Sequence, residues 1–366
     1  PDVVTLFESA PIASMGALGV LTPFSQIASP EEIEAIKTYF SAPALAGGTY
    51  KGELYGLVSI MATTLLGWNK QIVAAAGLDP DSPPTTMGEL EEWFEILTIV
   101  DSSGEIKQLG FPTFIGGGNG ALVWFANFGG KIYDPDTDTI TANDPNNVRA
   151  LEWMQSYSEK YGVEQLTRFN ASLADGAKTQ DPFISGQLAM SMIGPWQLGD
   201  FKRYAAEDFS VNMMELPPIA GEEDTTGRGN YMWGNYQIIP AATSHPKEAF
   251  EFVKWWSGFT DQSIMATIAA WNNTPVAISG SPQAATVPEI QAVIAENPLF
   301  QKFFDSLTST RIITQPMLPV GSFFMDRLGA EVDKALNLEQ SAQEALDIVQ
   351  QTVQQEYDTW KAQNPS

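Results

Sequence analysis

The stretch FISGQLAMSMIGPW, residues 183–196, says more about the fold of this chain than any other part of it. Its first half passes from the end of a helix into an apolar strand. Gly194 and Pro195 end that strand, so Trp196 stands in a loop and not in an apolar stripe. Trp196 is therefore a candidate for contact with a ligand.

Strand-like runs alternate with amphipathic helical runs on both sides of this stretch. Residues 3–7, 54–60 and 236–240 read as strands. Residues 86–99, with Thr85 or Thr86 as N-cap, and residues 143–161, with Asp144 as N-cap, read as helices. Residues 342–362 read as a closing helix with a core-facing apolar stripe at Leu346, Val349, Val353, Tyr357 and Trp360. This alternation predicts βα units with parallel sheets, an α/β fold. With 366 residues the chain has room for two domains of ordinary size.

The composition excludes several classes of function. Asp and Glu number 44 against 19 Lys and Arg, and the net charge of −25 would repel nucleic acid and anionic lipid heads. The chain has no cysteine and a single histidine, His245, so thiolate and multi-histidine metal sites cannot be built. No apolar run reaches the roughly 20 residues that span a bilayer. We expect no cofactor, no metal and no nucleic-acid partner.

Further segments match one family in their order along the chain. They are PDVV at residues 1–4, KGELYGL at 51–57, LGWNK at 66–70, AGLDP at 76–80, PPTTMGEL at 83–90, FGG at 128–130 and NDP at 143–145. Together with residues 183–196, they resemble the extracellular solute-binding proteins of ABC sugar importers, the maltose-binding-protein-like group.

The resemblance implies two α/β lobes with a ligand cleft between them. By the family pattern, lobe one holds residues 1–111 and 236–313, and lobe two holds residues 112–235 and 316–366. The strand, helix and strand that usually precede the first matched segment are absent from this sequence. Thr314-Gln315-Pro316 stands where the family often has Arg-Pro, so no arginine role is carried over.

The resemblance also implies a function. We expect a monomer outside the cytoplasm, in the periplasm or at the cell surface, with a lipid anchor on the precursor as a further expectation. It would bind a neutral mono- or oligosaccharide, close about a hinge and deliver the sugar to the permease subunits of an ABC importer, without catalysis. Two alternatives stay open: the same fold binding a glycerol phosphate or a polyamine, and a glycoside hydrolase, which needs two carboxylates across the scissile bond.

Sugars present apolar faces to aromatic rings and hydroxyls to polar groups, and these needs select the candidate site residues. Glu8 and Ser9 follow the first strand, at the end where open α/β sheets bind ligands. By family position, three aromatic rings and the amides beside the last of them join these residues: Trp196, Trp233, Trp271, Asn272 and Asn273. Further candidates stand in loops or at the starts of elements: Asn119, Trp124, Met61 and Phe323. The remaining tryptophans at helical apolar spacing are expected in the core: Trp93, Trp153, Trp255, Trp256 and Trp360.

Overall fold

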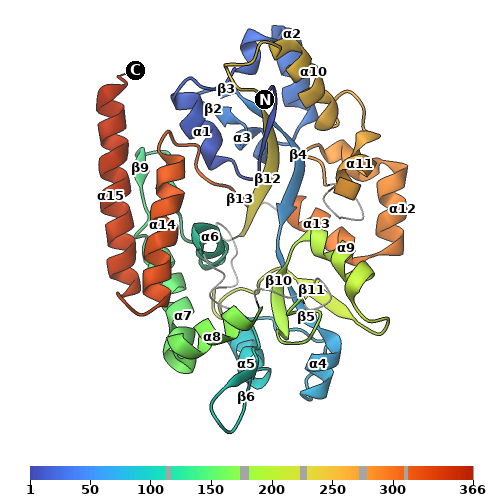
Figure 1. Ribbon diagram of the computed structural model, residues 1–366, viewed down its shortest axis with the longest axis vertical. Coiled ribbons are helices and arrows are strands. Elements are labelled where there is room, and N and C mark those ends of the chain that lie inside the picture. Colours follow the sequence, from blue (N-terminus) through green and yellow to red (C-terminus); the bar gives the residue numbers. More distant parts are fainter. Residues whose placement is uncertain (113–116, 174–180, 223–228, 272–277, 309–311, 366) are drawn as a thin grey trace. The chain divides into compact units, whose positions relative to one another are not determined.

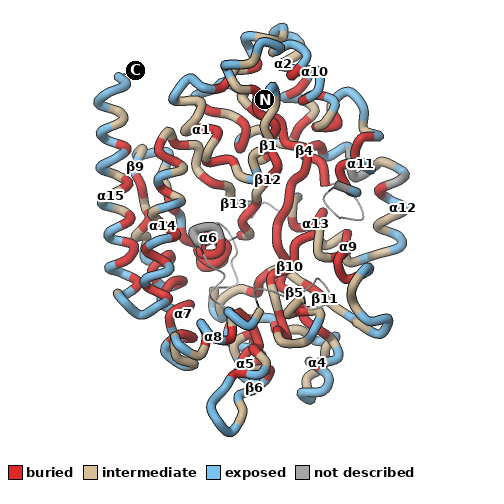
Figure 2. Tube along the Cα trace, viewed as in Figure 1, coloured by how far each residue is buried: buried red, intermediate tan, exposed pale blue. Residues whose placement is uncertain are grey.

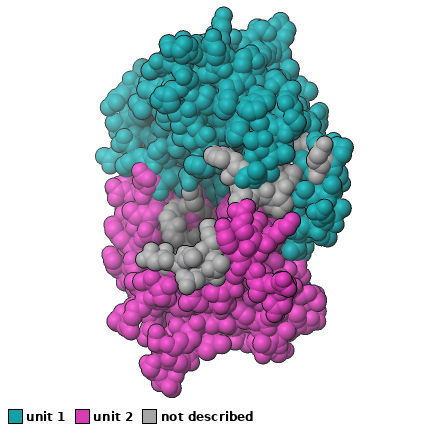
Figure 3. Space-filling model, turned by 45° about the vertical axis from the view of Figure 1, so that its right-hand side comes forward, with its two compact units in different colours: residues 1–63, 231–325, 353–366 teal, residues 64–230, 326–352 magenta. Residues whose placement is uncertain are grey.

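The computed structural model describes the chain except residues 113–116, 174–180, 223–228, 272–277, 309–311 and 366. It divides into two compact units (Figure 3). Unit 1 comprises residues 1–63, 231–325 and 353–366, and unit 2 comprises residues 64–230 and 326–352. Each unit combines a small sheet with several helices, which confirms the predicted α/β class.

The sheet of unit 1 is built on β12 (Asn230–Ile238). Both β1 (Val4–Leu6) and β4 (Gly56–Thr63) pair with it antiparallel, and β13 (Ile312–Ile313) completes the sheet. β4 is a nearly continuous apolar run, and all of its residues are buried (Figure 2). Such a run suits a strand that is covered on both faces.

Helices cover the sheet of unit 1 and share a core with it (Figure 1). α1 (Ala10–Ala17), α2 (Pro30–Tyr39) and α10 (Pro246–Trp256) supply Ile12, Ile36 and Phe250 to this core. The other helices that lie wholly in unit 1 are α3 (Ala42–Ala46), α11 (Ile264–Trp271), α12 (Pro288–Glu296) and α13 (Leu299–Thr308).

In unit 2, β5 (Leu65–Asn69) lies between β10 (Met190–Ile193) and β11 (Val211–Met214), and both neighbours run antiparallel to it. The expectation of parallel sheets is therefore wrong for four strand pairs: β1 and β4 with β12, and β5 with β10 and β11, all run antiparallel. Strands that pair here come from distant parts of the chain, so no short crossover fixes a parallel direction.

An aromatic core fills unit 2. α5 (Met87–Ile96), α6 (Gly117–Phe128) and α7 (Pro145–Tyr161) surround it, with Phe94 stacked on Phe111 at 4.7 Å between ring centroids. α4 (Lys70–Ala75), α8 (Val163–Leu173) and α9 (Pro195–Tyr204) belong to the same unit. The predicted caps are confirmed: the side chains of Thr86 and Asp144 accept backbone N–H groups at the starts of α5 and α7.

The last two helices, α14 (Gly321–Leu336) and α15 (Ala342–Gln363), each contain residues of both units. The apolar stripe predicted on α15 is confirmed, since Val349 and Val353 are fully buried. Trp360, near the end of α15, is half-buried under the ammonium of Lys51, 4.9 Å from its ring. No helix among the described residues has the length and apolarity needed to cross a bilayer.

The units differ in their boundaries from the predicted lobes. Residues 64–111 belong to unit 2, because β5 forms its sheet with β10 and β11, and residues 353–366 return to unit 1. The predicted crossing at residue 235 lies close to the observed one, between residues 230 and 231.

One tryptophan expected in the core lies outside it. Trp255 is 37% exposed and contacts Phe252, itself exposed, at 5.8 Å. α10 carries apolar residues on two faces, and Phe250 and Val253 occupy the face toward the core. By contrast, Trp93 is buried as predicted.

Candidate functional site

Glu8 and Ser9 lie in unit 1 where β1 turns into α1, and Gln315 holds both. The side-chain carbonyl of Gln315 accepts a hydrogen bond from the backbone N–H of Ala10 at 2.9 Å and one from the Ser9 hydroxyl at 3.5 Å. Its amide nitrogen donates to a carboxylate oxygen of Glu8 at 3.2 Å. Gln315 is only 2% exposed, so its side chain is fixed in place. It both holds the Glu8 carboxylate and pairs a backbone N–H at the start of α1.

The sequence marked position 315 only as a departure from an expected arginine. A glutamine there carries a donor and an acceptor, and the structure uses both at once. Without the fold, nothing connects this residue with a helix start more than three hundred residues earlier in the chain.

Two aromatic residues of β12 neighbour each other, and Tyr231 is close enough to Glu8 to be affected by its charge. Tyr231 and Trp233 are two positions apart, on the same face of the strand, with ring centroids 5.7 Å apart. Burial raises the pKa of the Tyr231 phenol well above its usual range, and the charge of Glu8 raises it further. Tyr231 is buried and Trp233 half-buried, so Trp233 is the ring of this pair with surface left for a ligand.

The other candidates of unit 1 are placed less favourably or not at all. Met61 is buried in the core of the unit, which assigns it to packing, and Phe323 on α14 is exposed. Trp271 is the last residue of α11, but its side chain lies outside the described part of the structure, as do Asn272 and Asn273 entirely.

Trp196 lies in unit 2 at the start of α9, directly after β10, and not in the loop expected from the sequence, because Pro195 begins the helix at once. Gly194 is the N-cap, and its N–H donates to the side-chain oxygen of Gln197 at 2.8 Å. The indole packs back over Gly194 so closely that a Cβ on that residue would lie 2.4 Å from the ring. A side chain at position 194 would therefore displace the half-buried indole from its place against the Gly194 backbone.

Trp124 has a different place. It is 1% exposed in the aromatic core of unit 2, with its ring 4.3 Å from that of Trp153 and 5.7 Å from that of Phe111. This burial assigns Trp124 to packing, and we leave it out of the proposed site. Asn119 lies on α6, but its side chain is outside the described residues.

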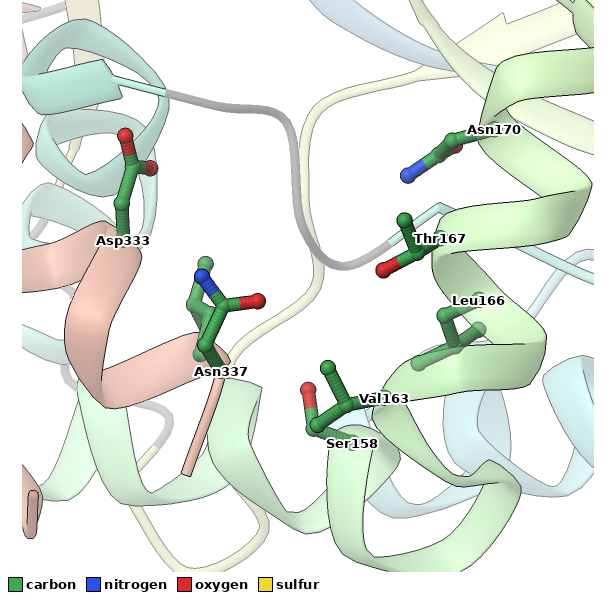
Figure 4. A pocket seen from close by; sticks show the side chains of 8 residues that line it. Ser158, Val163, Leu166, Thr167, Asn170, Asp333 and Asn337 are labelled. Atoms are coloured by element: carbon green, nitrogen blue, oxygen red, sulfur yellow. The ribbon is translucent and has the colours of Figure 1, made fainter. Parts of the chain in front are cut away.

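Unit 2 also contains a pocket of about 190 Å³ that the sequence did not indicate. Asp333 and Asn337 of α14 face Thr167 and Asn170 of α8 across it (Figure 4). Its lining is otherwise Ser158, Val163, Leu166 and Leu336. It has polar groups but no aromatic wall, so it offers no surface on which a sugar ring could stack.

Comparison with known proteins agrees with this architecture. The structure superposes on that of CpMnBP1 with mannobiose bound with a TM-score of 0.81, at 25% sequence identity, covering 96% of this chain and 84% of the other. This agreement confirms the two-lobed fold of periplasmic binding proteins.

The matched segment covers a smaller share of the curated relatives than of the structure above. The chain is 27% identical to the maltotriose-binding protein of Pyrococcus abyssi over 67% of this chain and 48% of the relative. It is 23% identical to the sn-glycerol-3-phosphate-binding periplasmic protein UgpB of Yersinia pestis, over 81% of this chain and 73% of the relative. The chain thus spans about half the length of the maltotriose-binding protein that it matches.

A family model described as bacterial extracellular solute-binding protein matches residues 1–302. That range includes β1 with Glu8, the strand before Trp196, and β12 with Trp233. The chain belongs to the family of bacterial extracellular solute-binding proteins.

Proposed function

We propose that this protein binds a neutral carbohydrate outside the cytoplasm and presents it to an ABC importer, without catalysis. The observation that carries the proposal is Trp196, a half-buried indole fixed against Gly194 at the start of α9. A rigid aromatic face suits the apolar face of a sugar ring, and relatives of this chain bind mannobiose and maltotriose.

Polar groups in unit 1 suit the hydroxyls of the same class of ligand. Glu8 offers carboxylate oxygens held by Gln315, and Trp233, packed against Tyr231, offers a second ring surface in unit 1. A site with fixed acceptors discriminates among sugars, because a wrong sugar leaves buried polar groups unpaired.

A glycerol phosphate is the second candidate, since one relative binds it. A phosphate ligand favours arginine, lysine or helix N-termini around its oxygens. The Glu8 carboxylate would instead repel it, so the described part of the candidate site favours a neutral ligand.

Calorimetric titration tests the proposal. Mannobiose, maltotriose, glucose and sn-glycerol 3-phosphate would be titrated separately, and the sugar would be recovered afterwards and analysed for cleavage. We expect micromolar or tighter binding of one sugar and its recovery intact. Binding of the phosphate alone would favour the second candidate, and cleavage of the sugar would favour a glycoside hydrolase.

Closure of the two units on the ligand and a monomeric state stay predictions of the family resemblance. Small-angle scattering with and without the bound sugar tests both. We expect a monomer mass and a smaller radius of gyration in the presence of sugar. An unchanged radius at saturating sugar would contradict closure.

A further inference from the structure

Several buried side-chain atoms of unit 2 have no hydrogen-bond partner among the described residues, and two of them, Thr64 Oγ1 and Asn230 Oδ1, belong to residues that contact each other. Thr64 is only 8% exposed. Leaving a buried hydroxyl or carbonyl unpaired costs folding free energy, because its hydrogen bonds to water are lost and not replaced, and most buried polar atoms in native proteins are paired. Two of them in one place therefore need an explanation.

The two residues are joined to each other. The amide nitrogen of Asn230 donates to the backbone carbonyl of Thr64 at 2.6 Å. This bond sets the orientation of the amide, so Asn230 Oδ1 points away from the carbonyl that its nitrogen contacts. The hydroxyl of Thr64 and the carbonyl of Asn230 are thus two unpaired groups attached to one hydrogen-bonded pair of residues.

Thr64 directly precedes β5, and the register of β5 with β10 leads toward Gly194 and Trp196. Leu65 of β5 pairs with Ile193 of β10, and the pairing is antiparallel. Continuing that register by one residue sets Thr64 opposite Gly194, the residue covered by the Trp196 indole. Thr64, Asn230 and Trp196 all belong to unit 2, so this neighbourhood does not depend on the placement of unit 1.

We infer that Thr64 and Asn230 form the polar part of a sugar subsite whose apolar wall is Trp196. The inference rests on the proposed function and adds residues and ligand chemistry to it. Asn230 Oδ1 can only accept a hydrogen bond, so the ligand must donate one there, as a sugar hydroxyl does. A fully ionised phosphate, which has only acceptors, would leave Asn230 Oδ1 unpaired.

Thr64→Val tests the inference because it replaces the hydroxyl with a methyl of nearly the same shape. We expect the affinity of the sugar to fall about tenfold, the value of one lost hydrogen bond. The Tm of the ligand-free protein should stay equal or rise, because an unpaired buried hydroxyl is removed. Thr64→Ser, which restores the hydroxyl, should bind within about twofold of wild type.

The neighbouring residue supplies a matched control. Thr63 is fully buried in unit 1, and its hydroxyl is paired with that of Ser306 at 3.3 Å. Thr63→Val should therefore lower the Tm and leave the affinity unchanged. Thr64→Val should thus lower the affinity without lowering the Tm, whereas Thr63→Val should lower the Tm without lowering the affinity.

A deoxy-sugar series completes the test. The analogue that lacks the contacted hydroxyl should bind wild type more weakly but bind Thr64→Val as well as the parent sugar does. Equal affinity of wild type and Thr64→Val for every sugar would overturn the inference and leave the proposed function standing. Failure of wild type to bind any sugar would overturn both.

Discussion

Trp196 and Gly194 act together, because the indole reaches its position only where residue 194 has no side chain. The glycine lets the ring lie against the backbone, and the Gln197 side chain closes the first turn of α9. Rigid aromatic anchors of this kind carry a large share of binding energy when a ligand covers them.

Trp196→Ala should weaken sugar binding by about 2 kcal/mol, roughly thirtyfold in Kd, with little change in circular dichroism. Because the ring is only half-buried, we expect it to contribute more to the free energy of sugar binding than to the stability of the fold. Isothermal calorimetry measures the loss. Trp255→Ala removes an exposed tryptophan of unit 1 and should leave Kd unchanged. Wild-type affinity in Trp196→Ala would remove this residue from the site.

Gly194→Ala tests whether sugar binding depends on the position of the Trp196 ring as well as on its presence. The added Cβ would lie 2.4 Å from the indole and must displace it, so we expect affinity to fall at least several-fold. Tryptophan fluorescence should change in the ligand-free protein too. Gly88→Ala is the control, since nothing lies within 4 Å of a Cβ there, and α5 should be equally or more stable. A Gly194→Ala protein that binds normally would show that the indole tolerates movement.

At the scale of elements, features that depend on residues near each other in the chain could be predicted from the sequence, whereas the strand pairings could not. The caps of α5 and α7 and the stripe of α15 depend on residues a few positions apart, which the sequence displays directly. The antiparallel pairing of β5 with β10 depends on contacts more than a hundred residues apart, and no local propensity encodes it. Likewise, Trp196 could be proposed from its motif, whereas Gln315, Thr64 and Asn230 become visible only through their partners.

α14 contains a buried carboxylate that makes its stability depend on pH. Glu331 is 1% exposed and accepts from Lys334 at 2.9 Å and from Gln340 at 2.9 Å, with Arg327 at 3.3 Å. Burial alone would raise the pKa of Glu331, but these hydrogen bonds and charges outweigh it and hold the pKa below the usual value.

The sign of the pH effect follows from this lowered pKa. The stabilising contribution is fully present above the pKa of the unfolded chain, 4.5, and is lost as pH falls through the lower folded value. Glu331→Gln should therefore destabilise the protein at pH 7 and lose less stability than wild type between pH 7 and pH 4. Urea midpoints across that range measure it. Parallel curves for the two proteins would contradict the assignment.

For the whole molecule, charge is the dominant feature. A net charge of −25 on 366 residues repels itself, and salt screens that repulsion over about 10 Å at 0.1 M. Raising NaCl from 10 mM to 500 mM should raise Tm by an amount on the order of 2–5 °C. Potassium chloride should act alike. A rise with sodium sulfate but not with either chloride would point to solute exclusion instead of screening.

The chain passes between the two units four times, and this decides where labels must be attached to follow both units. Residues 1–63 and 353–366 both belong to unit 1, so a dye or fusion partner attached near either end reports on the same body. A two-colour sensor needs its second label inside the chain. The Ser103-Gly104 turn between β6 (Ile99–Val100) and β7 (Ile106–Gln108) is exposed, belongs to unit 2 and lies outside the proposed sugar-binding residues, which makes it the natural insertion point.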